Sequence, residues 1–285
     1  MLILLFNLLN GLSFGAVLFL LTAGMVIVLG LMGILNLAHG AFFMVGAYVG
    51  LSLAKQGWNF FLACLCGGLA GALIGLLIER GFLQRLYRQP NAQVMVTLGF
   101  VYIIVNLIQW IWGGVTGIPF VPAFLSGSIN IGHLTYPIYR LFIIAVGLVI
   151  AAVLYWFGEK TRIGAMVRAG TDDKETVMGL GINFGLVSMT VFFLGAFIAG
   201  FAGGIGVSLF GAHLNLGWDV LFLALAVMVI GGMESVSGAL LASILIGIID
   251  AFGKAFFPGF AMFTIYFLFI IVLLLKPSGL LGRKT

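Results

Sequence analysis

The chain has 285 residues, of which 63% are hydrophobic and 7% charged, and its mean hydropathy is +1.27. A soluble domain carries roughly 25% charged residues, so this composition excludes a soluble protein and indicates a chain solvated by lipid. The formal net charge of +5 comes from basic residues in a few loops, and we do not expect nucleic-acid binding.

Three long stretches, residues 1–54, 89–139 and 176–218, carry no charged side chain. A helix that spans a bilayer needs about 20 apolar residues, whereas barrel strands alternate polar and apolar residues over about 10 positions. The stretches show no such alternation. We therefore predict an all-α integral membrane protein, a polytopic helical bundle of about 7–8 transmembrane helices with broken or re-entrant segments. Residues 1–285 would form one transmembrane domain.

Charges and turn residues divide the chain into predicted spans. In chain order these are residues 8–30, 37–54, 59–78, 92–112, 138–157, 184–210 and 259–275. Residues 113–137 and 211–219 are expected to be loops, the second a polar one containing His213, Asn215, Trp218 and Asp219. Residues 220–250 form two short apolar pieces split by residues 231–235. We expect a re-entrant hairpin there, and one continuous tilted span is the alternative.

Basic residues predict the orientation of the chain, because cytoplasmic loops are rich in Lys and Arg. Ten of the 13 basic residues lie in three regions: residues 79–91, residues 158–183 and the tail from Lys276. The other three are Lys55, Arg140 and Lys254. We therefore expect the three richer regions and the C-terminus in the cytoplasm, and the N-terminus on the opposite, periplasmic side.

Residues 30–46 interrupt a charge-free run with Gly, Asn and His. Irregular backbone at membrane depth is tolerated only where protein buries it or where it lines a watery cavity. Asn36 can cap the helix that follows, with His39 and Gly40 on its first turn, and the positive end of that helix would suit a carboxylate. This predicts a broken helix on a translocation path. The alternative is a packed kink with His39 satisfied in the core.

Residues 231–238 form a second Gly-rich break in an apolar run. Paired interruptions in the two halves of a chain indicate the transport site of repeat-built transporters. Gly231, Gly232, Glu234 and Ser235 are therefore further candidates for the path. Glu234 is either a gate or path residue or is solvated at the mouth of a cavity.

Residues 158–183 hold eight charged side chains between two predicted spans. Thr161 can cap a short helix that Gly170 would end, and Thr171 or Asp172 can cap a second, with capping-box spacing from Asp172 to Glu175. Gly179 and Gly181 would end the second helix. Two capped helices in one membrane loop indicate a docking surface for a soluble partner, and an ordinary solvated loop is the alternative.

Several motifs resemble permeases of the branched-chain amino acid ABC transporter family. They are GLMGILNLAHGAFFMVGAYV at 30–49, TRIGAMVRAGTDDKETVMGLGIN at 161–183, GAFIAGFAGGIGV at 195–207, GGMESVSGALLASILIG at 231–247 and KPSGLLGR at 276–283. The chain looks closest to the shorter of that family's two permease types. It departs from the family pattern at Glu234, where a small residue is usual, and at Lys276, where Arg is more usual.

The resemblance implies a bacterial inner-membrane importer subunit without catalytic residues or a metal site. It implies pairing with a second permease as a heterodimer, with two ATPase subunits that bind ATP and Mg²⁺, and with a periplasmic substrate-binding protein. The cargo would be a branched-chain or related hydrophobic amino acid, although family members also carry urea, amides and aromatic acids. The residues expected to couple to an ATPase are Arg168, Gly170, Thr171, Asp172, Asp173, Glu175, Met178 and Gly179.

The sequence contains no GxxxxGK[ST] phosphate-binding loop, so ATP chemistry would belong to partner chains. A different class of function, an ion-coupled secondary transporter or a channel, would need ionisable groups within the membrane. His39, Glu234 and Asp250 are the candidates for that role.

Overall fold

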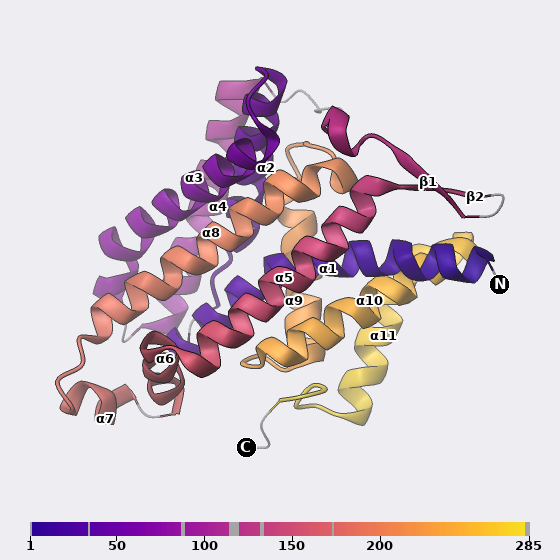
Figure 1. The fold of residues 1–285 in the computed structure, drawn as a ribbon. Helices are drawn as coiled ribbons and strands as arrows, with labels where there is room; N and C mark the ends of the chain where they lie inside the picture. Colours follow the sequence, from indigo (N-terminus) through magenta and orange to yellow (C-terminus); the bar gives the residue numbers. More distant parts are fainter. Residues whose placement is uncertain are drawn as a thin grey trace.

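The computed structural model describes residues 2–33, 35–86, 89–113, 120–131, 134–172 and 174–282. Nearly all of them are helical (Figure 1). The helices are α1 (Leu2–Met32), α2 (His39–Lys55), α3 (Phe60–Gly81), α4 (Pro90–Trp112), α5 (Ile138–Lys160), α6 (Arg162–Asp172), α7 (Lys174–Gly179), α8 (Phe184–Phe210), α9 (Leu216–Gly231), α10 (Val236–Phe256) and α11 (Ala261–Leu275), with 3₁₀ turns η1 (Leu83–Leu86), η2 (Ala123–Leu125) and η3 (Pro258–Phe260).

Six of these helices, α1, α3, α4, α5, α8 and α10, are long and apolar enough to cross a membrane. Helices α2, α9 and α11 are shorter, with 17, 16 and 15 residues. The predicted polytopic all-helical bundle is confirmed, and most predicted span boundaries lie within a few residues of the observed ones. The first helix is longer than predicted at both ends, because it begins at Leu2 and continues through Gly30 to Met32.

Helices α2, α3 and α8 pack closely through glycines. A methyl group on Gly46 of α2 would overlap the carbonyl oxygen of Gly200 in α8, and one on Gly67 of α3 would lie 2.7 Å from the carbonyl oxygen of Gly46. Where lipid surrounds a bundle, such small residues allow the close approach that drives helix association. The glycine-rich runs of the sequence are therefore helix contacts.

Helices α1 and α10 lie antiparallel. Gly11 contacts residues 247–248, Gly15 contacts residues 243–244, and Gly30 approaches Glu234. The chain breaks between α9 and α10, so the alternative of one continuous tilted span over 220–250 is wrong. Helix α10 is long enough to cross on its own.

The two ends of the bundle differ. Helices α6 and α7 lie at one, here named the α6 end, and the hairpin of β1 (Ser128–Ile131) and β2 (Leu134–Pro137) lies at the other, the hairpin end (Figure 1). The strands are antiparallel, with Ser128 opposite Pro137. The sequence predicted only a loop over 113–137, because strands this short carry little periodicity.

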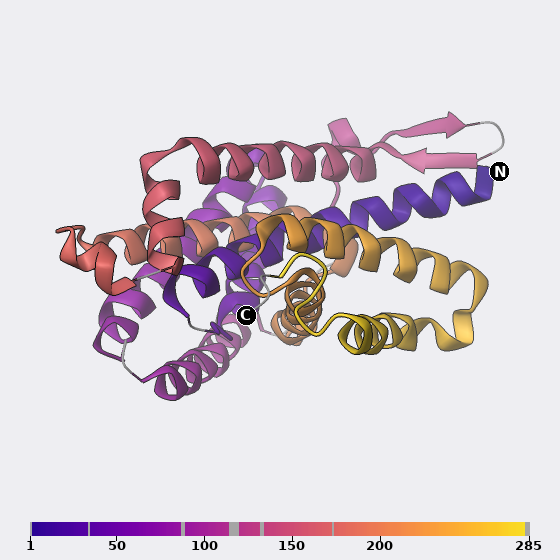
Figure 2. The ribbon, with the colours of Figure 1, turned by 90° about the horizontal axis from the view of Figure 1, so that it is seen from below.

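The three predicted cytoplasmic regions gather at the α6 end. Gly170 of α6 contacts Phe184 at the start of α8, and α3 runs antiparallel to α8, which brings its Gly81 end there. The tail returns from α11 to the end of α9 (Figure 2), where Leu280 N–H donates to Ile230 O at 2.8 Å. The described parts of the three basic regions therefore lie at one end, as the orientation prediction requires.

Candidate functional site

Residues 35–38 lead from the α6 end of α1 into the interior of the bundle. Asn36 is buried, and its Oδ1 accepts from Ala38 N–H at 3.0 Å. Leu37 N–H donates to Thr97 Oγ1 of α4 at 3.3 Å. The N-cap of α2 is Ala38, without a side-chain cap, so Asn36 stabilises the preceding turn and is not the predicted cap. Its Nδ2 finds no hydrogen-bond partner among the described residues.

His39 is the first residue of α2 and is fully buried. Its Nε2 lies 2.9 Å from the carbonyl oxygen of Leu21, well inside α1. A carbonyl only accepts, so Nε2 carries the proton and Nδ1 is left as an acceptor. Within the described part of the chain Nδ1 is unpaired. The polar segment 36–39 thus lies deep in the bundle with unused hydrogen-bonding capacity.

The first turns of α2 and α9 meet. A methyl group on Gly40 would overlap the carbonyl oxygen of Gly217 and lie 2.8 Å from Cβ of Leu221. Helix α2 runs from this contact toward the hairpin end, and α9 runs from it to the α6 end, where it stops at Gly231. Helices whose N-terminal turns meet inside the bundle are the arrangement found at the midplane sites of many transporters.

The second predicted break, residues 231–235, lies away from the first turn of α2. A methyl group on Gly30 would lie 3.8 Å from Cβ of Glu234 and 3.9 Å from Oγ1 of Thr171. Gly232 has a φ of +107° and contacts the tail, and Ser235 accepts from Gly238 N–H as the cap of α10. The structure therefore separates the two predicted groups of path residues: Asn36, His39 and Gly40 lie inside the bundle, and residues 231–235 lie at the α6 end.

The predicted coupling segment forms two helices, as expected. Thr161 Oγ1 accepts from Gly164 N–H at 3.0 Å and donates to Phe157 O at 2.6 Å, so it joins α5 to α6. The prediction that Gly170 ends the first helix is wrong. Helix α6 continues to Asp172, and Gly170 packs against α1, since a methyl group there would lie 2.8 Å from Cδ1 of Leu31.

The outer face of this segment is open. Arg168 lies 3.8 Å from Glu159, and both side chains are about half exposed. Thr171 donates within α6 to Val167 O, Met178 is exposed, and α7 ends at Gly179. Asp173 lies outside the described residues, and only the backbone is described for Asp172 and Glu175.

Sequence reasoning missed one polar group as a site. His213 Nε2 and Asp219 Oδ2 lie 2.9 Å apart beside the first turn of α9, and Asn215 is exposed next to them. The sequence predicted an ordinary polar loop because spacing alone does not report depth. The contact between Gly40 and Gly217 shows that the start of α9 reaches the first turn of α2 inside the bundle.

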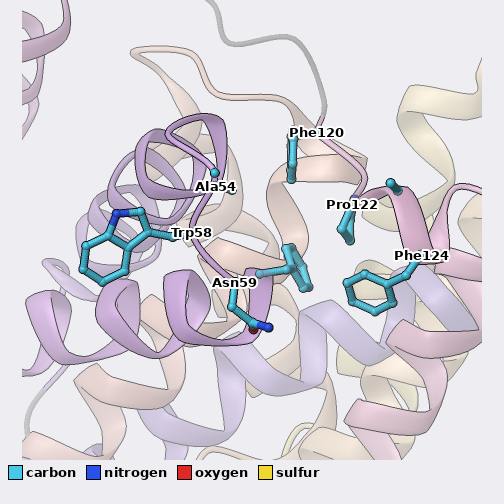
Figure 3. A pocket seen from close by; sticks show the side chains of 9 residues that line it. Ala54, Trp58, Asn59, Phe120, Pro122 and Phe124 are labelled. Atoms are coloured by element: carbon cyan, nitrogen blue, oxygen red, sulfur yellow. The ribbon is translucent and has the colours of Figure 1, made fainter.

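An apolar pocket of about 350 Å³ opens at the hairpin end (Figure 3). Its lining residues are Ala54, Gly57, Trp58, Asn59, Phe60, Phe120, Pro122, Ala123 and Phe124. None of the predicted path residues lines it. Among the described residues, no three His, Cys, Asp or Glu side chains come close enough to hold a metal ion.

The relatives of the chain decide the family. A family model described as branched-chain amino acid transport system / permease component matches residues 7–274. The chain belongs to this permease family. It is 28% identical over 295 residues to the high-affinity branched-chain amino acid transport system permease protein BraD of Pseudomonas aeruginosa, covering 97% of this chain and 95% of that protein.

Two further relatives separate the permease types. The chain is 26% identical to the permease protein LivH of Escherichia coli, covering 96% and 94% of the two chains. It is 28% identical to LivM of the same species, but covers 67% of that longer protein. The resemblance to the shorter permease type is thereby confirmed.

One solved structure shows the fold. The complex PsaBC from Streptococcus pneumoniae, solved with a Fab, contains a chain that matches with a TM-score of 0.53 and 13% identity. The match covers 94% of this chain and 91% of that chain. The chain thus has the fold of a multi-pass helical membrane protein, and residues 35–38 before α2 form a non-helical segment inside it.

Proposed function

We propose that this permease is the membrane subunit of an ABC importer that carries branched-chain or related hydrophobic amino acids into the cytoplasm. The observation that carries the proposal is the exposed α6–α7 element at the end of the bundle where the basic regions gather. Basic loops face the cytoplasm, so this element would meet soluble ATPase subunits. The protein would lie in the bacterial inner membrane with its N-terminus in the periplasm.

The partners follow from this arrangement. A second permease subunit would complete the path as a heterodimer, two ATPases would bind ATP and Mg²⁺, and a periplasmic binding protein would deliver the substrate. The chain itself would contribute no catalytic residue and no cofactor. Its relatives LivH and LivM are both described as permease proteins of branched-chain amino acid transport, which supports two permease types in one transporter.

The path would run past the point where the first turns of α2 and α9 meet. Asn36, His39 and Gly40 lie at the first turn of α2, and residues 231–235 with Glu234 would form the inner mouth or gate. Movement of α6 reaches this mouth directly, since Thr171 and Glu234 both approach Gly30. Urea, amides or aromatic acids are the alternative cargo.

The coupling proposal is tested by replacing Asp172, Asp173 and Glu175 together with Ala. The chain should still insert, because this segment lies outside the membrane, but uptake of L-leucine by cells should be abolished. Uptake and the amount of inserted protein are measured in the same membranes. Lys55→Gln, at the far end of α2, serves as the control and should transport normally. Uptake at the wild-type rate by the triple variant would contradict the coupling role.

A further inference from the structure

The pair of His213 and Asp219 lies at the start of α9. It flanks residues 216–217, where α9 meets the first turn of α2. That turn is fixed by the bond from His39 to Leu21 inside α1. The ring of Trp218 contacts the ring of Tyr102, midway along α4, at a tilt of 59° with the centroids 5.6 Å apart. Contacts to three helices therefore place the pair between the two membrane faces.

The pair is also open in the single subunit. The side chain of Asp219 is 58% exposed and that of His213 is 32% exposed, and Asn215 is exposed beside them. An ionisable group facing hydrocarbon is costly, and those within transmembrane bundles almost always face the interior or a water-filled cavity. Enclosing the pair in a dry subunit contact would impose the desolvation cost of both groups. A watery path avoids both costs.

A mainly apolar hollow lies on α4, linked to the pair through Trp218, the neighbour of Asp219 in the sequence. Tyr102, which touches Trp218, lines a shallow hollow of about 410 Å³ with Ile103, Asn106 and Leu107. A polar pair beside a mainly apolar hollow matches a small zwitterion with an apolar side chain, since ligand sites combine apolar lining with a few placed polar groups.

We propose that His213 and Asp219 line the substrate path and bind the charged head of the amino acid. On binding, the Nε2–H of His213 would leave Asp219 and donate to the substrate carboxylate, and the freed carboxylate of Asp219 would accept from the substrate ammonium group. The apolar side chain would face the hollow at Tyr102. This assignment rests on the proposed transport function and names the group in this chain that recognises its substrate.

The first test asks whether water reaches the residues beside His213 and Asp219, and it needs no substrate. Asn215→Cys is made with Cys64→Ala and Cys66→Ala in the assembled transporter, and whole cells are treated with a positively charged methanethiosulfonate reagent. Labelling is expected at Asn215→Cys. Val149→Cys, an exposed position midway along α5, is the matched control and should stay unlabelled. An unreactive Asn215→Cys would overturn the proposal.

The second test asks whether the pair recognises the amino acid. Asp219→Asn should lower L-leucine uptake by the complete transporter in proteoliposomes about tenfold, because one charge-assisted hydrogen bond is lost. Asp250→Asn, which removes the carboxylate 2.6 Å from Lys254 in α10, is the control and should transport like wild type. Wild-type uptake by Asp219→Asn would contradict the assignment. Failure of the wild-type transporter to import L-leucine would instead contradict the proposed function.

A purely structural pair is distinguished by exchanging the two residues. His213→Asp with Asp219→His keeps a carboxylate beside an imidazole but moves each charge, so the exchange should stay impaired if the pair binds substrate. Restoration of uptake by the exchange would show a structural role and overturn the proposal.

Discussion

At the scale of single residues, packing depends on glycines where two backbones meet. Gly46→Ala should destabilise the protein by about 1–3 kcal/mol, because its methyl group would overlap the backbone of Gly200 and neither helix can yield alone. Gly99→Ala in α4, where the methyl group would meet nothing within 4 Å, is the matched control. Thermal unfolding in detergent should separate the two variants. Equal stability would contradict the close α2–α8 packing.

The sequence predicted residues whose chemistry is local, and it failed where depth or packing decides. Thr161 and Gly181 behave as predicted, since a hydroxyl cap and a positive φ of +81° are local properties. The prediction that Gly170 ends a helix was wrong, because the surroundings of Gly170 depend on Leu31, which is far away in the sequence. His213 and Asp219 were missed because only the fold brings a polar loop to membrane depth.

At the scale of elements, the tail holds the α9–α10 break. Leu280 and Leu281 donate to Ile230 O and Gly231 O at 2.8 and 3.0 Å. Gly279 has a φ of +78°, and a methyl group there would lie 2.6 Å from Gly232 N. Gly279→Ala should therefore weaken this contact, at a cost of about 1–2 kcal/mol for the backbone conformation alone.

Amide hydrogen exchange measures that effect directly. The amides of Leu280 and Leu281 should exchange faster in Gly279→Ala than in wild type, since both lose their acceptors. Gly259→Ala, in open space between α10 and α11, should leave both amides protected. Unchanged exchange in Gly279→Ala would show that the tail does not depend on this turn.

Most helices could be predicted because the charge-free runs are long. The break at 231–235 was also predicted, because its glycines and polar residues interrupt an apolar run. Neither the short strands β1 and β2 nor the meeting of α2 with α9 could be predicted, because each depends on pairing between segments that sequence periodicity does not report.

At the scale of the whole molecule, the distribution of basic residues predicts the orientation of the bundle. Leu180→Cys, exposed in the turn after α7, should react with an impermeant thiol reagent only in inside-out vesicles. Gln56→Cys, in the loop after α2, should react only in intact cells. These two variants are made with Cys64→Ala and Cys66→Ala. The reverse pattern would contradict the proposed orientation and the coupling role of α6 and α7.

The central claim is that this permease moves amino acids only when partner subunits supply the energy. Uptake of radiolabelled L-leucine is measured in proteoliposomes that hold either this chain alone or the full set of two permeases, ATPases and binding protein, with ATP inside. We expect ATP-dependent uptake by the full set of subunits and no uptake by the lone chain. Uptake by the lone chain, driven by an ion gradient or by diffusion, would contradict it.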